Sequence, residues 1–331
     1  MNSIKNLSAC ALAGQKIITG FDCKVLDDKT RKFFSDVKPG GIILFKRNIQ
    51  DSAQLKKLNF DILNFFKDIK LPAPFISIDQ EGGIVSRMKK PFFEELEGID
   101  TIFTEEDAKN HASKMAALLK KHGINMNMAP VLDISDLEPD SIMKKRTFKG
   151  NAIKVSILGA KMIKTYMDNN IIPVGKHFPG IGGTKIDSHL FLPEYEKEIS
   201  SMEKNDLVPF AKAFKSQLPA LMFSHVLYKK LDDKWPASLS VEVCRELLRK
   251  KMGFNKVTMT DDLDMKAVKS DIKTSALKIM EADMDIALIC HNFDNVYKIH
   301  EIFTKEIENN NNNLLISIKR IFNLKKKFLA E

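Results

Sequence analysis

Short apolar runs alternate along the chain with longer segments in which apolar residues recur at helical spacing. Eight of the short runs predict β-strands: Lys16–Phe21, Gly41–Phe45, Pro74–Ile78, Ile124–Leu132, Ile171–Val174, Ala220–Phe223, Val257–Met259 and Asp285–Ile289. Apolar positions three and four residues apart predict helices at about 151–168, 203–216, 240–252, 265–281 and 293–308. This alternation favours a parallel sheet in an α/β protein, and eight repeats predict its closure into a (β/α)8 TIM barrel.

The clearest predicted helix begins at Thr104 and ends at Gly123. The Thr104 side chain can cap it, and acidic residues follow in the first turn, where the helix dipole favours negative charge. The run Asn309–Asn313 predicts a linker to a closing helix at 314–329. Barrels of this kind commonly reach such a size as one unit, so we expect residues 1–331 to form a single catalytic barrel domain.

Polar residues collect directly after the predicted strands. In chain order these are Asp22; Arg47 and Asn48; Asp79 and Glu81; Asp133; Lys176 and His177; Ser224 and His225; Asp261 and Asp262; and His291 and Asn292. The carboxyl ends of the strands of a (β/α)8 barrel meet on one face, which carries the active site in enzymes of this fold. Ordinary polar loops account for several of these residues, but less easily for the clusters after the third, fifth and seventh strands.

The composition is typical of a soluble globular protein, with 44% hydrophobic and 29% charged residues. No apolar run is long enough to span a bilayer. The segment from Lys5 to Cys10 superficially resembles a lipoprotein processing site, but a secretory signal needs an apolar region of roughly 7–15 residues. The cysteines, Cys10, Cys23, Cys244 and Cys290, lie far apart without metal-like spacing, which favours reduced thiols and a cytoplasmic location.

The formal charge of +9 arises from 52 Lys and Arg residues against 43 Asp and Glu residues. Near the C-terminus the basic residues alternate with apolar residues at helical spacing, which is typical of the solvated face of an amphipathic helix. We therefore expect neither a nucleic-acid nor a membrane partner. The sequence contains no glycine-rich phosphate loop and no HExxH motif, so we expect no cofactor and no metal.

A set of short motifs covers nearly the whole chain. They are Gly40–Phe45 with Arg47 and Asn48, Asp79–Gly83 with Arg87, Ala129–Asp133, Arg146–Phe148, Lys176–Gly180, Asp187–His189, His225 with Val226, Pro236 and Ala237 with Ser240, Leu247–Arg249 with Gly253 and Phe254, and Asp261–Leu263 with Met265. In this order they resemble the β-N-acetylhexosaminidases of glycoside hydrolase family 3, specifically the short, single-barrel bacterial form of peptidoglycan recycling.

The resemblance implies three catalytic residues. Asp261 is the nucleophile that forms a covalent glycosyl intermediate, and His189 is the acid/base, oriented by Asp187. A retaining glycosidase needs an ionised carboxylate near the anomeric carbon and a proton donor on the leaving-group side. Histidine donates only when protonated, and a carboxylate two residues away favours the imidazolium. The resemblance also places the segment with His189 on a mobile loop after the fifth strand, so the acid would enter the site when this loop closes.

The resemblance also implies a group of residues that bind the terminal sugar: Asp79, Arg87, Arg146, Lys176 and His177. Carboxylates and cations suit this task because charge-assisted hydrogen bonds hold hydroxyl groups at fixed angles. For the two arginines the alternative is a role as surface cations.

Further positions have structural interpretations. Asp133 is more typical of an acceptor at the end of a strand, His225 of a core histidine, and Asp261 could also cap a helix starting near Leu263. Three positions depart from the family pattern: Ile84 replaces a common arginine, Ile181 a usual histidine, and Gly183 a frequent aspartate. These departures concern the loops and surroundings of the site rather than the assigned residues.

The expected function is removal of a terminal β-linked N-acetylglucosamine from a small saccharide or muropeptide, in cell-wall recycling. A family 3 β-glucosidase or a glycoside phosphorylase is an alternative enzyme, although β-glucosidases usually carry an additional domain that supplies the acid/base. A catalytically weak barrel that binds sugars is an alternative of another class, because fold alone does not confer activity.

Overall fold

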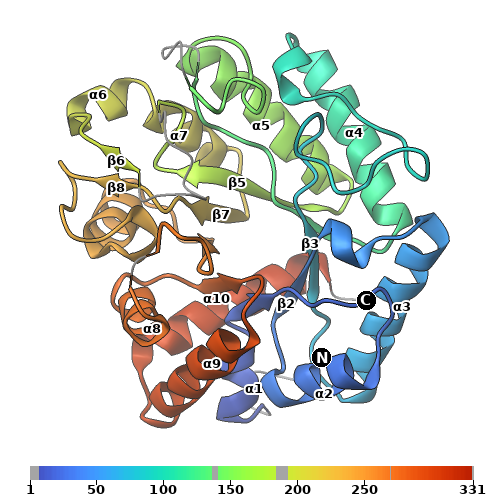
Figure 1. The fold of residues 1–331 in the computed structure, drawn as a ribbon. Coiled ribbons are helices and arrows are strands. Elements are labelled where there is room, and N and C mark those ends of the chain that lie inside the picture. Colours follow the sequence, from blue (N-terminus) through green and yellow to red (C-terminus); the bar gives the residue numbers. More distant parts are fainter. Residues whose placement is uncertain (1–6, 136–140, 184–192, 269, 330–331) are drawn as a thin grey trace.

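Eight parallel strands form a closed barrel surrounded by helices (Figure 1). The computed structural model describes residues 7–135, 141–183, 193–268 and 270–329. Neighbouring strands follow the order β1-β10-β9-β7-β5-β4-β3-β2, in which β2 closes onto β1. This arrangement confirms the predicted (β/α)8 TIM barrel.

The strands of the barrel lie where the apolar runs predict them, but their lengths differ. Their bounds are β1 Ile17–Thr19, β2 Gly41–Leu44, β3 Phe75–Ile78, β4 Met126–Asn127, β5 Ile172–Phe178, β7 Ala220–Phe223, β9 Val257–Asp262 and β10 Ile286–Ile289. A separate pair, β6 (Glu194–Tyr195) and β8 (Leu227–Tyr228), lies outside the barrel.

The predicted strand Ile124–Leu132 is wrong in length, because the regular strand covers only Met126–Asn127. Beyond Asn127 the chain still makes individual backbone hydrogen bonds to β5. For example, the Val174 N–H donates to the Ala129 carbonyl over 3.0 Å. In contrast, β5 and β9 run further than predicted and include the polar residues at their ends. The polar residues after the fifth and seventh predicted strands therefore belong to the strands themselves, whereas Asp79 and Glu81 follow β3.

Helices surround the barrel and connect its strands. Their bounds are α1 Ala9–Gly14, α2 Asp28–Val37, α3 Ser52–Asp68, α4 Glu105–Lys121, α5 Ala152–Asp168, α6 Ile199–Lys204, α7 Leu207–Lys215, α8 Ile272–Glu281, α9 Phe293–Glu308 and α10 Asn312–Phe328, with 3-10 turns at Lys46–Asn48, Ile99–Thr101 and Ala237–Leu239 and a π-helical segment at Glu242–Lys251. None of the helices in these described ranges is long and apolar enough to cross a membrane.

Three helix predictions need correction. The segment 203–216 is not one helix, because Asn205 interrupts it between α6 and α7. The helix predicted from 265 begins only at Ile272, with Asp271 as its cap, so the interpretation of Asp261 as a helix cap is wrong. The predicted asparagine linker is too long, since α10 starts within the run. In contrast, the Thr104 cap is confirmed, as Thr104 and Asp107 form a reciprocal capping box.

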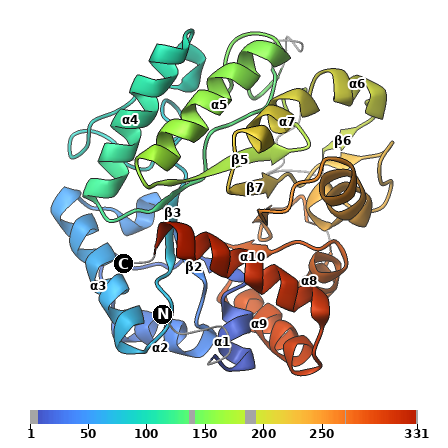
Figure 2. The same cartoon turned by 180° about the vertical axis from the view of Figure 1, so that it is seen from behind.

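The closing helix α10 lies across the amino-terminal end of the barrel, as Figure 2 shows from behind. Its Ile321, Leu324 and Phe328 pack against the apolar residues that fill the barrel. The buried ammonium of Lys325 donates to the Gln15 side chain over 2.7 Å and to the Ala73 carbonyl over 2.9 Å. This end of the barrel is therefore closed, and the polar strand ends lie at the other end.

Candidate active site

A buried ion network joins the ends of β3 and β5. The Lys176 ammonium lies 2.9 Å from Asp79 Oδ1 and 2.7 Å from Glu81 Oε1. The Arg146 guanidinium binds the Glu81 carboxylate through two nitrogens, at 2.7 and 3.0 Å, and Arg87 lies 3.3 Å from Asp79. Four of the five predicted sugar-binding residues thus lie together.

The network keeps its members charged. Burial by itself would raise the pKa of Asp79, but the nearby Lys176 and Arg87 outweigh it and hold that pKa well below its ordinary value. Lys176 and Arg146 likewise lower the pKa of Glu81 against the effect of burial. For Lys176, burial lowers the pKa and the two carboxylates more than compensate, so the ammonium form is favoured. The site therefore offers fixed, desolvated charges to a polar ligand.

The Arg87 side chain retains capacity for a ligand. Its Nη2 atom binds Asp79, while its buried Nε atom has no acceptor within the described part of the chain. The side chain as a whole is 29% exposed, so its guanidinium can still meet a ligand hydroxyl. Three cations, Arg87, Arg146 and Lys176, face the Asp79 and Glu81 carboxylates, and the Asp133 carboxylate also acts on Arg146 electrostatically.

His177 is oriented by Asp133. The ring Nδ1 lies 2.8 Å from Asp133 Oδ2, and the backbone N–H of His177 donates to the same carboxylate over 3.2 Å. The Ile181 N–H donates to its other oxygen over 2.8 Å. Asp133 is thus the strand-end acceptor that the sequence favours, and it also directs the Nε2 side of the His177 ring away from itself.

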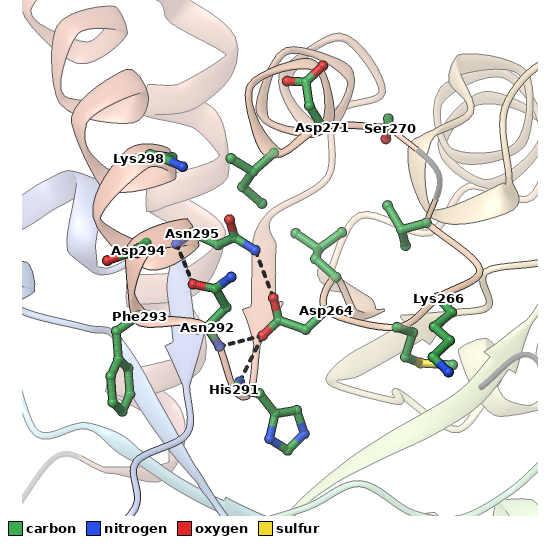
Figure 3. Close-up of a pocket in the computed structure, with 14 residues that line it drawn as sticks. Asp264, Lys266, Ser270, Asp271, His291, Asn292, Phe293, Asp294, Asn295 and Lys298 are labelled. Atoms are coloured by element: carbon green, nitrogen blue, oxygen red, sulfur yellow. Dashed lines mark hydrogen bonds between the residues drawn. The ribbon is translucent and has the colours of Figure 1, made fainter. Parts of the chain in front are cut away.

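The three aspartates at the end of β9 have different partners. Asp262 Oδ1 accepts from the Cys290 and Asp264 N–H groups, at 3.0 and 3.1 Å. The Asp264 carboxylate accepts from the N–H groups of His291 and Asn292 and from the Asn295 side chain, at 2.8 to 2.9 Å (Figure 3). Both carboxylates therefore hold the connection between β10 and α9, which supports Asp261 as the reactive carboxylate.

Asp261 lies at an irregularity of the strand. Met259 pairs with Ile286 and Asp262 with Leu288, so β9 has one more residue than β10 between these pairs. The Leu288 N–H donates to the Thr260 side chain over 3.0 Å, which satisfies it where the regular ladder is broken. Such bulges are common beside active sites because they redirect a side chain.

Asp187 and His189 lie outside the described residues. The departures nearby can be placed. Ile181 is buried, Ile84 is exposed, and a Cβ at Gly183 would lie 2.2 Å from the Tyr195 hydroxyl. An aspartate at position 183 would therefore require Tyr195 to move, which relates this departure to local packing.

Glu81 is a residue of the site that the sequence analysis did not assign to it. It is almost fully buried and binds both Lys176 and Arg146. The available signal was its position in the cluster after the third strand, where a second carboxylate follows Asp79. The buried Lys176 and the partly buried Arg146 share this carboxylate, and the sequence does not show which residues become buried.

An open cavity of about 860 Å³ lies between the β9–α8 connection and the start of α9 (Figure 3). None of the predicted site residues that the structure describes lines it. The Asp264 carboxylate, which lines the cavity, accepts from the His291 and Asn292 N–H groups just before α9. Among the described residues, no group of three or more His, Cys, Asp or Glu side chains is arranged to hold a metal ion.

Two curated relatives are beta-hexosaminidases. The enzyme of Neisseria meningitidis serogroup C is 34% identical over 289 residues, with 84% of this chain and 78% of that protein covered. Beta-hexosaminidase A of Pseudoalteromonas piscicida is 29% identical over 86% of this chain, but the match spans only 54% of that longer protein.

Solved structures of relatives share the fold. A glycoside hydrolase family 3 β-N-acetylglucosaminidase from Paenibacillus has a TM-score of 0.93 and 30% identity, covering 98% of this chain and 63% of that one. NagZ from Neisseria gonorrhoeae, in complex with N-trifluoroacetyl-D-glucosamine, has a TM-score of 0.82 and 29% identity, covering 93% and 89%. Residues 10–324 match the sequence model of the glycosyl hydrolase family 3 N-terminal domain, and the chain therefore belongs to this family.

Proposed function

We propose that the protein is a retaining exo-β-N-acetylglucosaminidase that removes a terminal β-linked N-acetylglucosamine. The observation that carries the proposal is the network of Asp79, Glu81, Arg146 and Lys176, which lies at the same end of the barrel as Asp261. The names of the relatives, beta-hexosaminidase and β-N-acetylglucosaminidase, support this choice of sugar.

The proposed reaction has two steps. The Asp261 carboxylate attacks the anomeric carbon while His189 gives a proton to the glycosidic oxygen, so the C–O bond breaks and a glycosyl ester forms. In the second step His189 takes a proton from water, whose oxygen attacks the anomeric carbon and releases Asp261. The network of charged residues holds the sugar hydroxyls, and its fixed hydrogen bonds position the anomeric carbon.

The proposed substrate is a cytoplasmic muropeptide or another small saccharide that ends in N-acetylglucosamine. The partly exposed Arg87 and Arg146 side chains suit a leaving group that carries a carboxylate. No cofactor is required for this chemistry.

The test compares hydrolysis of an aryl β-N-acetylglucosaminide with that of the matching aryl β-glucoside. We expect the wild type to prefer the first substrate and Asp261→Asn to hydrolyse neither. Preference for the glucoside would indicate the β-glucosidase alternative, and sugar 1-phosphate formed in phosphate buffer would indicate a phosphorylase. Binding of N-acetylglucosamine without turnover of either substrate would indicate a sugar-binding barrel.

A further inference from the structure

His225 connects the strand that carries Asp261 to the neighbouring strand, at the level where their backbone pairing ends. The last pair between β7 and β9 is Phe223 with Thr260. Two residues later the His225 ring, which is 1% exposed, places Nε2 at 2.9 Å from the Asp262 carbonyl oxygen. A side-chain hydrogen bond thus continues the contact between these strands.

The hydrogen-bond partners of the His225 ring indicate which of its nitrogens carries the proton. A carbonyl oxygen only accepts, so Nε2 donates to Asp262. In a neutral ring Nδ1 then accepts, and the Ser238 hydroxyl, 2.6 Å away, is its donor. Ser238 is itself held, since its N–H donates to the Ser224 carbonyl over 3.1 Å. The orientation and the tautomer of the ring are therefore specified together.

The backbone that His225 holds also contacts the carboxylate of Asp261. The Asp262 N–H donates to Asp261 Oδ1 over 2.8 Å. On the β10 side, Asp262 is held through its own carboxylate by the Cys290 N–H, and the Leu263 N–H donates to the Leu288 carbonyl. His225 supplies the corresponding bond on the β7 side. The bulge is thus held on both sides.

We propose that His225, oriented by Ser238, is a positioning residue that aims the Asp261 carboxylate at the anomeric carbon. This inference rests on the proposed function, in which Asp261 is the nucleophile. His225 does not exchange a proton with the substrate in this role, because its Nε2–H is used by the Asp262 carbonyl. It acts through the backbone of β9.

The variants are His225→Leu, which removes the hydrogen bonds to Asp262 and Ser238, and His225→Gln, whose amide can still donate to the carbonyl. We expect His225→Leu to lower kcat about 10- to 100-fold, the scale of a misplacement of about 1 Å. KM and inhibition by N-acetylglucosamine should change less than about threefold, because the sugar-binding network is separate. His225→Gln should recover most of the loss, and Ser238→Ala should show a smaller loss of kcat.

The chain offers matched controls. His122 is also 1% exposed and also bonds a serine hydroxyl, of Ser52, and a backbone carbonyl, of Leu118, each at 2.8 Å. Ser240 is buried two residues after Ser238, but its hydroxyl bonds the Asp232 carboxylate over 2.7 Å. His122→Leu and Ser240→Ala should lower the melting temperature to a similar extent and leave kcat unchanged.

Three kinetic outcomes would overturn the inference. If His225→Leu lowered stability but not kcat, or if Gln were no better than Leu, the hydrogen bond would have no positioning role. The proposed proton donor, His189, should make kcat/KM fall at high pH as it loses its proton. If His225→Leu abolished this fall, His225 would be the proton donor instead. We expect the fall of kcat/KM at high pH to persist in His225→Leu.

A crystal structure of His225→Leu tests the inference without turnover. We expect the Asp261 carboxylate to move by about 1 Å relative to the wild type. An unmoved carboxylate would overturn the positioning role whatever the activity. Failure of the wild type to hydrolyse any aryl N-acetylglucosaminide would instead refute the proposed function, while the displacement would still decide the structural inference.

Discussion

Asp261, Asp262 and Asp264 lie within four residues of one another, yet their carboxylates have different surroundings. Burial raises the pKa of Asp262 to about 7, and the neighbouring Asp264 and Asp261 carboxylates add to the effect. Its Oδ1 atom accepts from two backbone N–H groups, which favours a structural role for the Asp262 carboxylate. The backbone N–H groups that Asp262 accepts from can be served equally well by an amide oxygen.

We therefore predict that Asp261→Asn loses turnover by about 10⁴-fold or more, the scale expected when a nucleophile is removed. Asp262→Asn keeps its acceptor oxygen and should stay within about tenfold of the wild type, or about 1.4 kcal/mol in the barrier. A fluorinated glycoside that traps the intermediate should label Asp261 in mass-spectrometric peptide mapping. An adduct on Asp262 would contradict this assignment.

The acid/base role of His189 is a prediction from the sequence. His189→Ala should slow hydrolysis of natural glycosides by roughly 10²–10⁴, the range for loss of a general acid/base. Activated aryl substrates should lose less in the first step, because a good leaving group needs little protonation. Equal losses for leaving groups of very different pKa would mean that His189 only shapes its loop.

At the scale of elements, the sequence predicts the centres of strands and helices better than their ends. The segment 263–271 has helical apolar spacing, but the turn bond from the Met265 N–H to the Asp262 carbonyl and the contacts of Asp264 keep it out of α8. Similarly, β5 extends through His177 because Asp133 from the β4 side binds its backbone. The contacts of Asp264 and Asp133 join distant parts of the chain, so they cannot be inferred from periodicity.

The cap of α4 was predictable, since all its partners are local. Thr104→Ala removes the acceptor for the Asp107 N–H and should destabilise the protein by about 1 kcal/mol. Thermal and urea unfolding would measure this loss, and kcat should not change. Thr304, in the interior of α9, caps no helix start, so Thr304→Ala is a suitable control with an expected change within about 0.5 kcal/mol. Equal effects of both variants would contradict a capping role.

For the whole molecule, the alternation of strands and helices was sufficient to predict the barrel. The spacing of apolar residues distinguishes a strand from a helix, because it marks the face of each element that becomes buried. The active-site network was predictable only in part. Position after a strand identified Asp79 and Lys176 as candidates, whereas the partnership of Glu81 with Arg146 depends on a contact across 65 residues. Charge pairing over such distances appears only once the barrel is closed.

The closed end of the barrel predicts an unusual pH dependence. Burial lowers the pKa of Lys325 to about 7 and that of Lys16 to about 8, while an unfolded lysine keeps its proton up to about pH 10.4. Between these values the unfolded state binds more protons, so the free energy of unfolding should rise from pH 7 to about pH 10. The slope is at most about 1.4 kcal/mol per pH unit for each lysine.

Urea unfolding at several pH values measures this slope. Lys325→Met should reduce it, because the titrating group is gone, whereas Lys319→Met on the exposed face of the same helix should not. The same slope in the wild type and in Lys325→Met would show that Lys325 is not responsible.

An amine that is partly neutral near pH 7 is a nucleophile, but Lys325 is shielded by the helix that carries it. An acylating reagent such as an N-hydroxysuccinimide ester could therefore reach it only when α10 leaves the end of the barrel. The acylation rate of Lys325, followed by mass spectrometry, would then measure how often α10 leaves the end of the barrel. Because the proposed sugar site lies at the opposite end of the barrel, saturating N-acetylglucosamine would slow this acylation only if sugar binding also stabilises the docked position of α10.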